Sequence, residues 1–414
     1  MRRISSNMNN NDVQLNLRKQ ESRLNKANGQ LSSQQRIQNL RDDPIAAGHL
    51  VRYQSYSARV EQFKKNAQTL SDRYTVAEGY INQSVQIMQR IRELAVQGAN
   101  GIYTKEDLNN MSVEVNELLK ELVENANSVS PDGNALFAGT STNRTAFEVE
   151  NGPVKGSSDP QIINVRYNGN NQSNNIEVDE TSYMNFNGDG SRVFWAENQH
   201  LIAMRDATGF TAKEDSVISI DGQQININKG DNVYSLIAKI NDSGAAVKAS
   251  LDPVTSGLNI STTDAHQLWL QDVKGSTFTE LGLVKDGNQR PPYNLSDGAR
   301  ISGGSLFDAV IELRDAMIAG NTEIIGGRAL GAIDSGLNNL VTRLAETGSL
   351  YERAQLNIAK ADNNQLNVTS QISREGDLDF TKAVTDMRML EYVQQATLST
   401  AGRLYENTLL NYLR

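Results

Sequence analysis

The chain has 414 residues, of which 38% are hydrophobic and 21% charged, and its net charge is −9. This length is enough for two or three domains, while the hydrophobic content is lower than a compact enzyme of this size needs and suits exposed helical bundles with thin cores. The lack of Cys excludes disulfides, thiolate metal sites and Cys nucleophiles, and no apolar run approaches the length of a membrane span.

The charge is distributed unevenly along the chain. Residues 1–66 hold twelve Arg and Lys against five Asp and Glu, which leaves the remainder strongly acidic. A basic arm can bind nucleic acid, but no aromatic residue for base stacking precedes Tyr53, so we expect acidic protein neighbours and no nucleic acid. The first residues have no apolar signal-peptide region, so if the protein leaves the cytoplasm we expect a route other than a cleaved general secretory signal.

Residues 1–44 form the first expected region, an N-terminal assembly arm. Val13, Leu17, Leu24 and Leu31 mark a thin apolar seam at helical spacing among many polar residues. A seam this thin does not offset the entropy of ordering the chain, so we expect the arm to be disordered alone and helical in an assembly.

Residues 45–143 are expected to form the N-terminal half of a helical rod. Asp43 and Pro44 provide a cap and a first helical residue, and the helix is expected to run to about Gln97. Thr104 begins a shorter helix through a capping box, and Pro131 opens the turn that ends it. An apolar ladder with alternating steps of three and four residues marks the buried face of the long helix: Val60, Phe63, Ala67, Leu70, Tyr74, Ala77, Ile81, Ser84, Met88, Ile91 and Ala95.

Residues 144–300 change to a two-residue period, which predicts a β-rich insert of one or two subdomains. Strands are expected at 162–167 and 175–178 around a Gly/Asn-rich turn. A second set comprises strands at 217–220, 225–227, 247–251 and 258–261 with a helix at 231–241.

The helical pattern returns in residues 301–376, the C-terminal half of the rod, and in 377–414, a C-terminal assembly helix. The longest ladder in the chain is Leu330, Ile333, Leu337, Leu340, Leu344, Thr347, Tyr351, Ala354, Ile358, Ala361, Gln365, Val368 and Ile372. A helix of that length spans roughly 65 Å. The last helix begins near Phe380, and its expected assembly residues are Leu390, Leu398, Leu404, Leu409, Leu410 and Leu413.

These patterns together predict a mainly α fold with an α+β insert. The N- and C-terminal regions form a long antiparallel helical coiled-coil rod, and the middle forms a β-rich domain. The three His residues are scattered without a carboxylate or second His at ligand spacing, and the calcium-loop-like segment at 185–190 lacks the required acidic ends, so it is interpreted as a turn. We therefore expect no catalytic site, no metal and no cofactor.

Several segments resemble a known family. The Met1–Ser5 start, Arg36, Asp42-Asp43-Pro44 and the run from Arg92, Glu93, Leu94 and Ala95 to Asn100 and Gly101 resemble the N-terminal region of bacterial flagellins. Leu136-Phe137-Ala138-Gly139 matches the segment that follows, and 218–263 resembles the insert module of flagellins and hook proteins. The Asp-Asp-Pro form and the Leu-Phe-Ala-Gly stretch are most similar to the hook-associated proteins of the hook–filament junction. At Gln34 the family usually has Gly.

The resemblance implies a structural role in the bacterial flagellum, after uncleaved type III export. Its implied partners are other copies of the chain, the other hook–filament junction protein, flagellin, and an export chaperone on the C-terminal helix, with no membrane insertion. The flagellum would lie outside the cell, or in the periplasm of an organism with internal flagella.

Three other interpretations remain open. Filament flagellin is the nearest, and the motif forms above argue against it. A tropomyosin-like coiled coil does not account for the β-rich insert. An enzyme with its site in the insert would require clustered carboxylates or His, which the sequence does not show.

Overall fold

The computed structural model describes residues 6–157, 159–285, 289 and 291–410, and the side chains of 6–10 and 403–410 lie outside this description. The chain divides into two compact units. The first comprises residues 1–65 and 357–414, and the second comprises residues 66–356. The fold is the expected one, with long helices in the terminal regions and antiparallel sheets in the middle.

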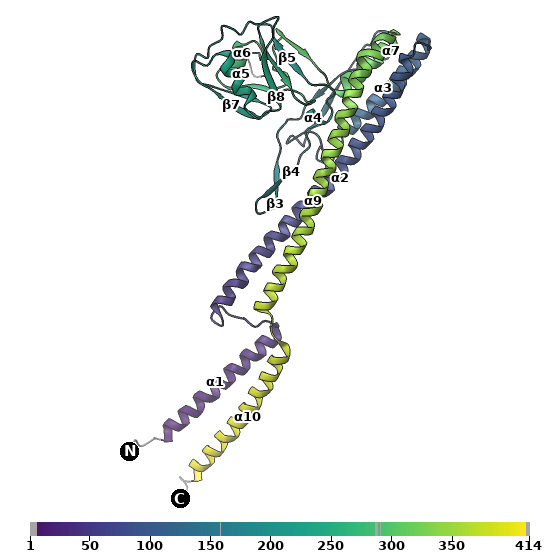
Figure 1. Cartoon of the computed structure of the whole chain (residues 1–414). Helices are drawn as coiled ribbons and strands as arrows, with labels where there is room; N and C mark the ends of the chain where they lie inside the picture. The colour runs from purple at the N-terminus through teal and green to yellow at the C-terminus, as the bar shows by residue number, and fades with distance from the viewer. Residues whose placement is uncertain (1–5, 158, 286–288, 290, 411–414) are drawn as a thin grey trace. The chain divides into compact units, whose positions relative to one another are not determined.

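The first unit contains two pairs of helices. α1 (Ser6–Ser33) packs against α10 (Phe380–Leu410), and the two run in opposite directions (Figure 1). The second pair combines the beginning of α2 (Pro44–Ala99) with the end of α9 (Leu330–Gly376). Lys64 and Asp362 form an ion pair of 2.6 Å between these two helices, which places them side by side.

In the second unit, α2 and α9 continue as an antiparallel pair. Arg92 Nε lies 2.5 Å from Asp334 Oδ1, and farther along Gln355 Nε2 donates to Ser71 Oγ at 2.8 Å. α3 (Lys105–Ala126) packs against α7 (Leu306–Ala319), and the short α8 (Thr322–Ile324) and a π-helical turn, Ile325–Ala329, lead into α9. This unit is therefore a bundle of more than two helices.

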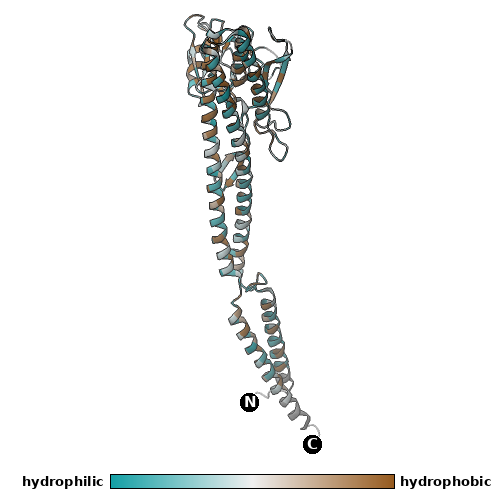
Figure 2. Ribbon diagram, turned by 90° about the vertical axis from the view of Figure 1, so that its right-hand side faces the viewer, coloured by the Kyte–Doolittle hydropathy of each residue, from teal (hydrophilic) through white to brown (hydrophobic). Residues whose placement is uncertain are grey.

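Both sequence ladders lie on the buried faces of their helices, as predicted. Ile81, Met88 and Ile91 of α2 are at most 1% exposed, and every position of the α9 ladder is at least partly buried. Figure 2 shows apolar and polar residues interspersed along the long helices. Among the described residues, no helix combines the length and the apolar character that crossing a membrane requires.

The predicted helix starts at Asp43 and Thr104 and the predicted break near Gly376 are also confirmed, whereas α3 ends at Ala126, before the turn at Pro131. Asp43 Oδ1 accepts the N–H of Ala46 at the start of α2, and Thr104 forms a capping box with Asp107 at the start of α3. α9 ends at Gly376, where the sequence predicts a break. Local cap chemistry determines these boundaries, which explains why they can be predicted without tertiary information.

In the described part of the middle region, the strands form four antiparallel sheets. Two are hairpins, β1 (Phe147–Gly152) with β2 (Gln161–Tyr167), and β3 (Asn175–Asp179) with β4 (Ser182–Asn185). The other two have the strand orders β10-β6-β7 and β11-β5-β9-β8. Their strands are β5 (His200–Ala203), β6 (Ser216–Ile220), β7 (Gln223–Ile227), β8 (Val247–Leu251), β9 (Leu258–Thr262), β10 (Leu270–Lys274) and β11 (Ala299–Ser302), and the short helices are α4 (Gly190–Val193), α5 (Val233–Asn241) and α6 (Thr277–Glu280).

Each strand predicted from the sequence is present, but five of the seven pairings between described strands involve one that the sequence pattern did not reveal: β1, β4, β5, β10 or β11. β2 and β3, expected around one turn, pair with β1 and β4 respectively. β4 has only four residues, too few to show a reliable alternation.

The second unit has two hydrophobic cores. One joins the helices to the first hairpin, with Phe147, Phe194 and Phe307 in mutual ring contact. The other lies within residues 200–302, hereafter the β-module, and is formed by residues of its sheets and of α5 and α6, such as Leu201, Ile218 and Phe278. The predicted 218–263 module is the central part of this segment.

Candidate assembly interface

The terminal helix pair places five of the ten expected assembly residues on one seam. Val13, Leu17, Leu24 and Leu31 of α1 are partly buried, and so are Ala383, Met387, Leu390 and Thr397 of α10. Ala401, 5% exposed, is the most buried of the α10 seam residues whose side chains are described. The spacing on both helices is the alternation of three and four that a two-helix seam requires.

The other expected assembly residues lie off this seam or outside the description. Leu398 is 52% exposed, on a different side of α10 from Leu390 and Thr397. Leu404, Leu409 and Leu410 belong to α10, but their side chains are not described, and Leu413 lies outside the described residues. The assembly role of these five residues, like that of the five on the seam, stays a prediction.

The terminal pair meets the neighbouring helices at a joint built around Arg36. Its backbone N–H donates to the carbonyl of Gly376 at 2.8 Å, and its guanidinium Nη2 donates to the carbonyl of Glu375 at 2.7 Å. Leu378 N–H donates in turn to the carbonyl of Gln34. These bonds join the α1–α2 linker to the end of α9, which gives the family-motif residue Arg36 a structural role.

Gln34 adopts a backbone conformation that explains the family preference at this position. Its φ is +57°, in the left-handed region that Gly adopts without strain and other residues adopt at a cost. The joint therefore needs this conformation even though the chain carries Gln there.

Asp42 and Asp43 hold the same joint from the α2 side. Asp42 accepts from Lys26 Nζ at 2.8 Å, and this hydrogen bond lowers the pKa of the Asp42 carboxyl below its ordinary value. Asp43 caps α2 through Ala46 N–H, which is the main cause of its lowered pKa, and Asp43 also lies 3.3 Å from the Arg36 guanidinium. Pro44 follows as the first residue of α2.

The Arg92–Gly101 motif attaches the end of α2 to α9 and then terminates the helix. Leu94 and Ala95 are buried in the helical core, at 2% and 0% exposure, while Arg92 pairs with Asp334 and Glu93 pairs with Arg90 on the surface. Asn100 N–H donates to the carbonyl of Gln97, and Gly101 turns the chain with a φ of +65°.

Phe137 and Gly139 form a tight turn against the core of the second unit. Phe137 is 1% exposed and lies edge-to-face with Phe194 at 5.2 Å. Gly139 has a φ of +61°, and a Cβ added there would lie 2.1 Å from the carbonyl oxygen of Asn170. Glycine is required at this position for both reasons.

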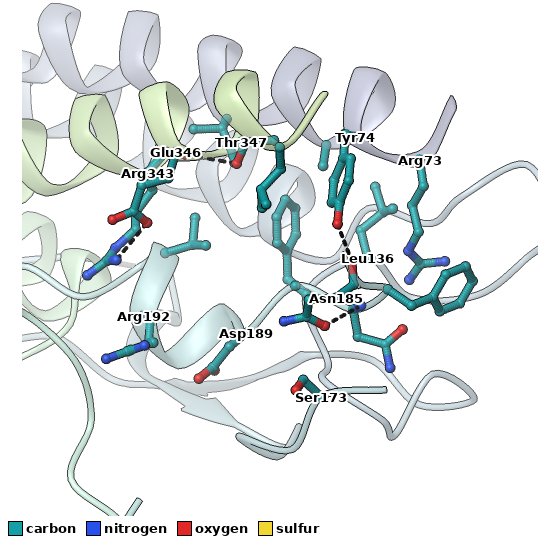
Figure 3. A pocket seen from close by; sticks show the side chains of 18 of the residues that line it. Arg73, Tyr74, Leu136, Ser173, Asn185, Asp189, Arg192, Arg343, Glu346 and Thr347 are labelled. Atoms are coloured by element: carbon teal, nitrogen blue, oxygen red, sulfur yellow. Dashed lines mark hydrogen bonds and ion pairs between the residues drawn. The ribbon is translucent and has the colours of Figure 1, made fainter. Parts of the chain in front are cut away.

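A cavity of 290 Å³ lies between α2, α9 and the segment that follows β4 (Figure 3). Tyr74 donates its hydroxyl hydrogen to the carbonyl of Asn185, and burial raises the pKa of Tyr74 to about 12. Of the cations in its lining, Arg192 and Arg343 are paired with Asp264. Among the described residues no group of three or more His, Asp or Glu is arranged to hold a metal ion.

Three family models match this chain. The bacterial flagellin N-terminal helical region matches residues 4–142, the bacterial flagellin C-terminal helical region matches 330–413, and the flagellin hook IN motif matches 216–264. Together the three regions cover more than half of the chain. The last contains β6 to β9 and α5, and so corresponds to the centre of the β-module.

Curated relatives and solved structures share this similarity. Flagellin D of Vibrio anguillarum is 26% identical over 90% of this chain and 88% of its own length, and Flagellin A of Vibrio cholerae is 26% identical over 96% and 94%. A structure of flagellar hook associated protein-3 from Legionella pneumophila aligns with 78% of this chain and 97% of its own, at 15% identity and a TM-score of 0.46. A putative flagellar hook-associated protein from Vibrio parahaemolyticus aligns with 81% and 100%, at 15% identity and a TM-score of 0.48.

Proposed function

The chain belongs to the bacterial flagellin family and is a structural protein of the flagellum, and we propose that it acts at the hook–filament junction as the third hook-associated protein. The sequence at the start of α2 is the observation that favours a junction protein over a filament flagellin. Asp42-Asp43-Pro44 resembles the junction proteins, whereas filament flagellins typically have Asp-Asp-Ala-Ala-Gly-Leu there. Pro44 pre-sets φ at the first helical position, next to the Arg36 joint.

Filament flagellin is the second candidate. The observation in its favour is that the curated relatives above carry that name and align with this chain over most of their length. The two candidates share the fold and the terminal helices, so only assembly behaviour separates them.

The terminal helices are the proposed means of assembly. The seam between α1 and α10 leaves Val13 and Leu24 only partly buried, so it returns little of the roughly 1–2 kcal/mol per residue that ordering the backbone costs. In this proposal both ends remain unfolded through type III export and pair as a coiled coil inside the tube, where neighbouring copies bury the remaining apolar surface. Folding coupled to docking prevents premature polymerisation.

The proposed partners follow from this position. They are copies of the same chain, the other hook–filament junction protein, the first flagellin subunits and, before export, a chaperone on the C-terminal helix. The proposed location is the flagellum outside the cell, or in the periplasm where flagella are internal. No cofactor takes part.

A deletion strain separates the two candidates. Loss of a junction protein should leave hooks intact while flagellin escapes into the medium, and restoring the gene should restore filaments. Loss of a filament flagellin should instead leave the junction complete, with no leaked flagellin derived from this gene. Purified protein that polymerises alone into long filaments would also contradict the junction role.

A truncated chain tests the division into arms and folded bundle. Removing residues 1–38 and 390–414 should leave a soluble helical monomer that cannot join the structure, and loss of the fold would refute the division.

Leu390→Asp tests the seam itself, since a charge on a partly buried seam position should block assembly while thermal unfolding of the bundle is unchanged. Leu390→Met, which conserves volume, is the matched control and should assemble. The sequence makes the same prediction for Leu404→Asp.

A further inference from the structure

His266 lies at the centre of a charge network that the sequence pattern did not indicate. The side chain is 3% exposed, and its Nδ1 lies 2.8 Å from Asp264 Oδ1 while its Nε2 lies 3.0 Å from Asp221 Oδ2. Sequence spacing gives no sign of this arrangement, because the fold brings Asp221 from the distant β6–β7 turn to the His266 ring. Ionised carboxylates only accept hydrogen bonds, so both ring nitrogens must carry a proton.

The network continues from the β-module to two helices outside it. Asp264 Oδ2 accepts from Arg343 Nη2 on α9 at 2.9 Å and from Arg192 Nη2 on α4 at 3.3 Å. Arg343 Nη1 also donates to Glu346 at 2.8 Å. Charges of opposite sign therefore alternate from Asp221 to Glu346, and the Arg343 side chain is only 11% exposed.

Among the described residues, the β-module makes few other contacts with the helical part of the second unit. Its apolar core is separate from the helical core. Trp269 of the module packs against the helical core, with its ring edge-on to that of Tyr167 at 6.3 Å between centroids. Tyr293 of the module donates a hydrogen bond to the Tyr167 carbonyl at 2.9 Å. Next to His266, Gln267 N–H donates to the carbonyl of Ser191 at 3.2 Å.

We propose that His266, clamped as an imidazolium between Asp221 and Asp264, is a charge-dependent latch that fixes the orientation of the β-module against α4 and α9. Loss of the positive charge releases the module as a folded body. The module survives release because its own core does not include the latch residues. His266 is a positioning residue in this device, and its ligands are parts of the same chain.

The sign of the pH dependence follows from the surroundings of the ring. Burial alone would lower the pKa of His266, but the hydrogen bonds to Asp221 and Asp264 raise it to about 9. The folded pKa lies above the unfolded one, so the latch is fully formed below about pH 6.5 and is lost as pH rises through about 9. The charged or titratable groups that surround the ring are Asp221 and Asp264 on the module, Asp189 and Arg192 at α4, and Arg343 and Glu346 on α9.

At acid pH the dependence runs in the opposite direction, because the titrating group is the Asp264 carboxyl. Burial by itself would raise the pKa of the Asp264 carboxyl, but hydrogen bonding and charge from His266, with Arg192 and Arg343, hold it well below its usual range. The stabilisation from Asp264 is therefore present above its unfolded pKa of about 4 and is lost only as pH falls through the lowered folded value. The latch stays closed between the acid and alkaline limits.

Hydrogen–deuterium exchange of the full chain, measured from pH 6 to pH 10 and corrected for intrinsic rates, tests the latch. In the native protein we expect protection of the Gln267 amide to fall about tenfold or more as pH passes 9, while the β6–β7 amides remain protected. His266→Gln should remove the Gln267 protection at every pH. His200→Gln, at an exposed His of the same module, is the matched control and should behave as the native chain.

Two results would overturn the proposal. One is native-like Gln267 protection in His266→Gln. The other is loss of β6–β7 protection together with Gln267 protection as the native chain passes pH 9, which would make His266 an ordinary core residue. Should His266→Gln fail to fold, Arg343→Gln removes the α9 partner of Asp264 and provides a second test. Faster exchange of the Gln267 amide while the β6–β7 amides stay protected supports the latch. Unchanged exchange of the Gln267 amide contradicts it.

Discussion

The two helix pairs of this chain carry the same heptad signal but bury it to different extents. In the second unit, Ile81, Met88 and Ile91 of α2 are essentially inaccessible to water. In the first unit, the corresponding seam residues of α1, such as Leu17 and Leu24, are only partly buried. The difference lies in the number of layers. α3, α7 and the β1–β2 hairpin supply residues to the core around α2 and α9, whereas α1 and α10 bury one seam between two helices.

The outer faces of α1 and α10 also carry apolar side chains that remain exposed to water. Leu15 of α1 is 52% exposed and Tyr392 of α10 is 74% exposed. At about 25 cal/mol per Å² of apolar surface, such residues contribute to stability only when another surface covers them. A heptad pattern therefore specifies which face a helix buries, and the number of elements packed around that face determines how completely it is buried.

Truncation of a fully buried seam residue should produce the largest effect. Ile91→Ala removes a side chain that is 0% exposed and leaves a cavity, so we expect the free energy of unfolding to fall by about 2–5 kcal/mol. Urea denaturation followed by circular dichroism measures the change. Leu24→Ala, on the partly buried α1 seam, is the matched comparison and should cost less than about 1 kcal/mol in the subunit. Equal losses would mean that the two seams are not different.

Loss of the Arg36 side chain should have a smaller effect, confined to the terminal joint. Arg36→Ala removes two hydrogen bonds to the Glu375 carbonyl, together worth about 1 kcal/mol at this exposure, and also removes the ion pair with Asp43. We expect faster hydrogen exchange of the Leu378 amide and unchanged exchange in the second unit. Arg36→Lys keeps the charge without the planar fork and should recover only part of the protection.

The smallest effect comes from two glycines in helix interiors. A Cβ added at Gly79 of α2 or at Gly402 of α10 meets no atom within 4 Å. Gly79→Ala should therefore stabilise the free subunit by about 0.5–1 kcal/mol through helix propensity. Gly402→Ala should leave the unfolding midpoint of the free subunit unchanged if the terminal helices fold only on assembly. An equal rise in both variants, measured by calorimetry, would show that α10 is already part of the cooperative subunit.

Local features of this protein could be read from its residues. The ladders of α2 and α9, the caps at Asp43 and Thr104 and the end of α9 at Gly376 agree with the structure because spacing and cap chemistry act within a few residues. The family motifs were found in the same way, although the residues alone did not show that Gly139 is held by the Asn170 carbonyl.

The sequence by itself determined the helical rod pattern, the β-rich middle and the helix boundaries, since each depends on short-range periodicity. Only the tertiary structure decided which seam is fully buried, which short strands pair, and that Asp221 and Arg343 meet through His266 and Asp264. Those outcomes depend on contacts between residues far apart in the chain, which follow from the packing of whole elements and leave no periodic trace in the residues themselves.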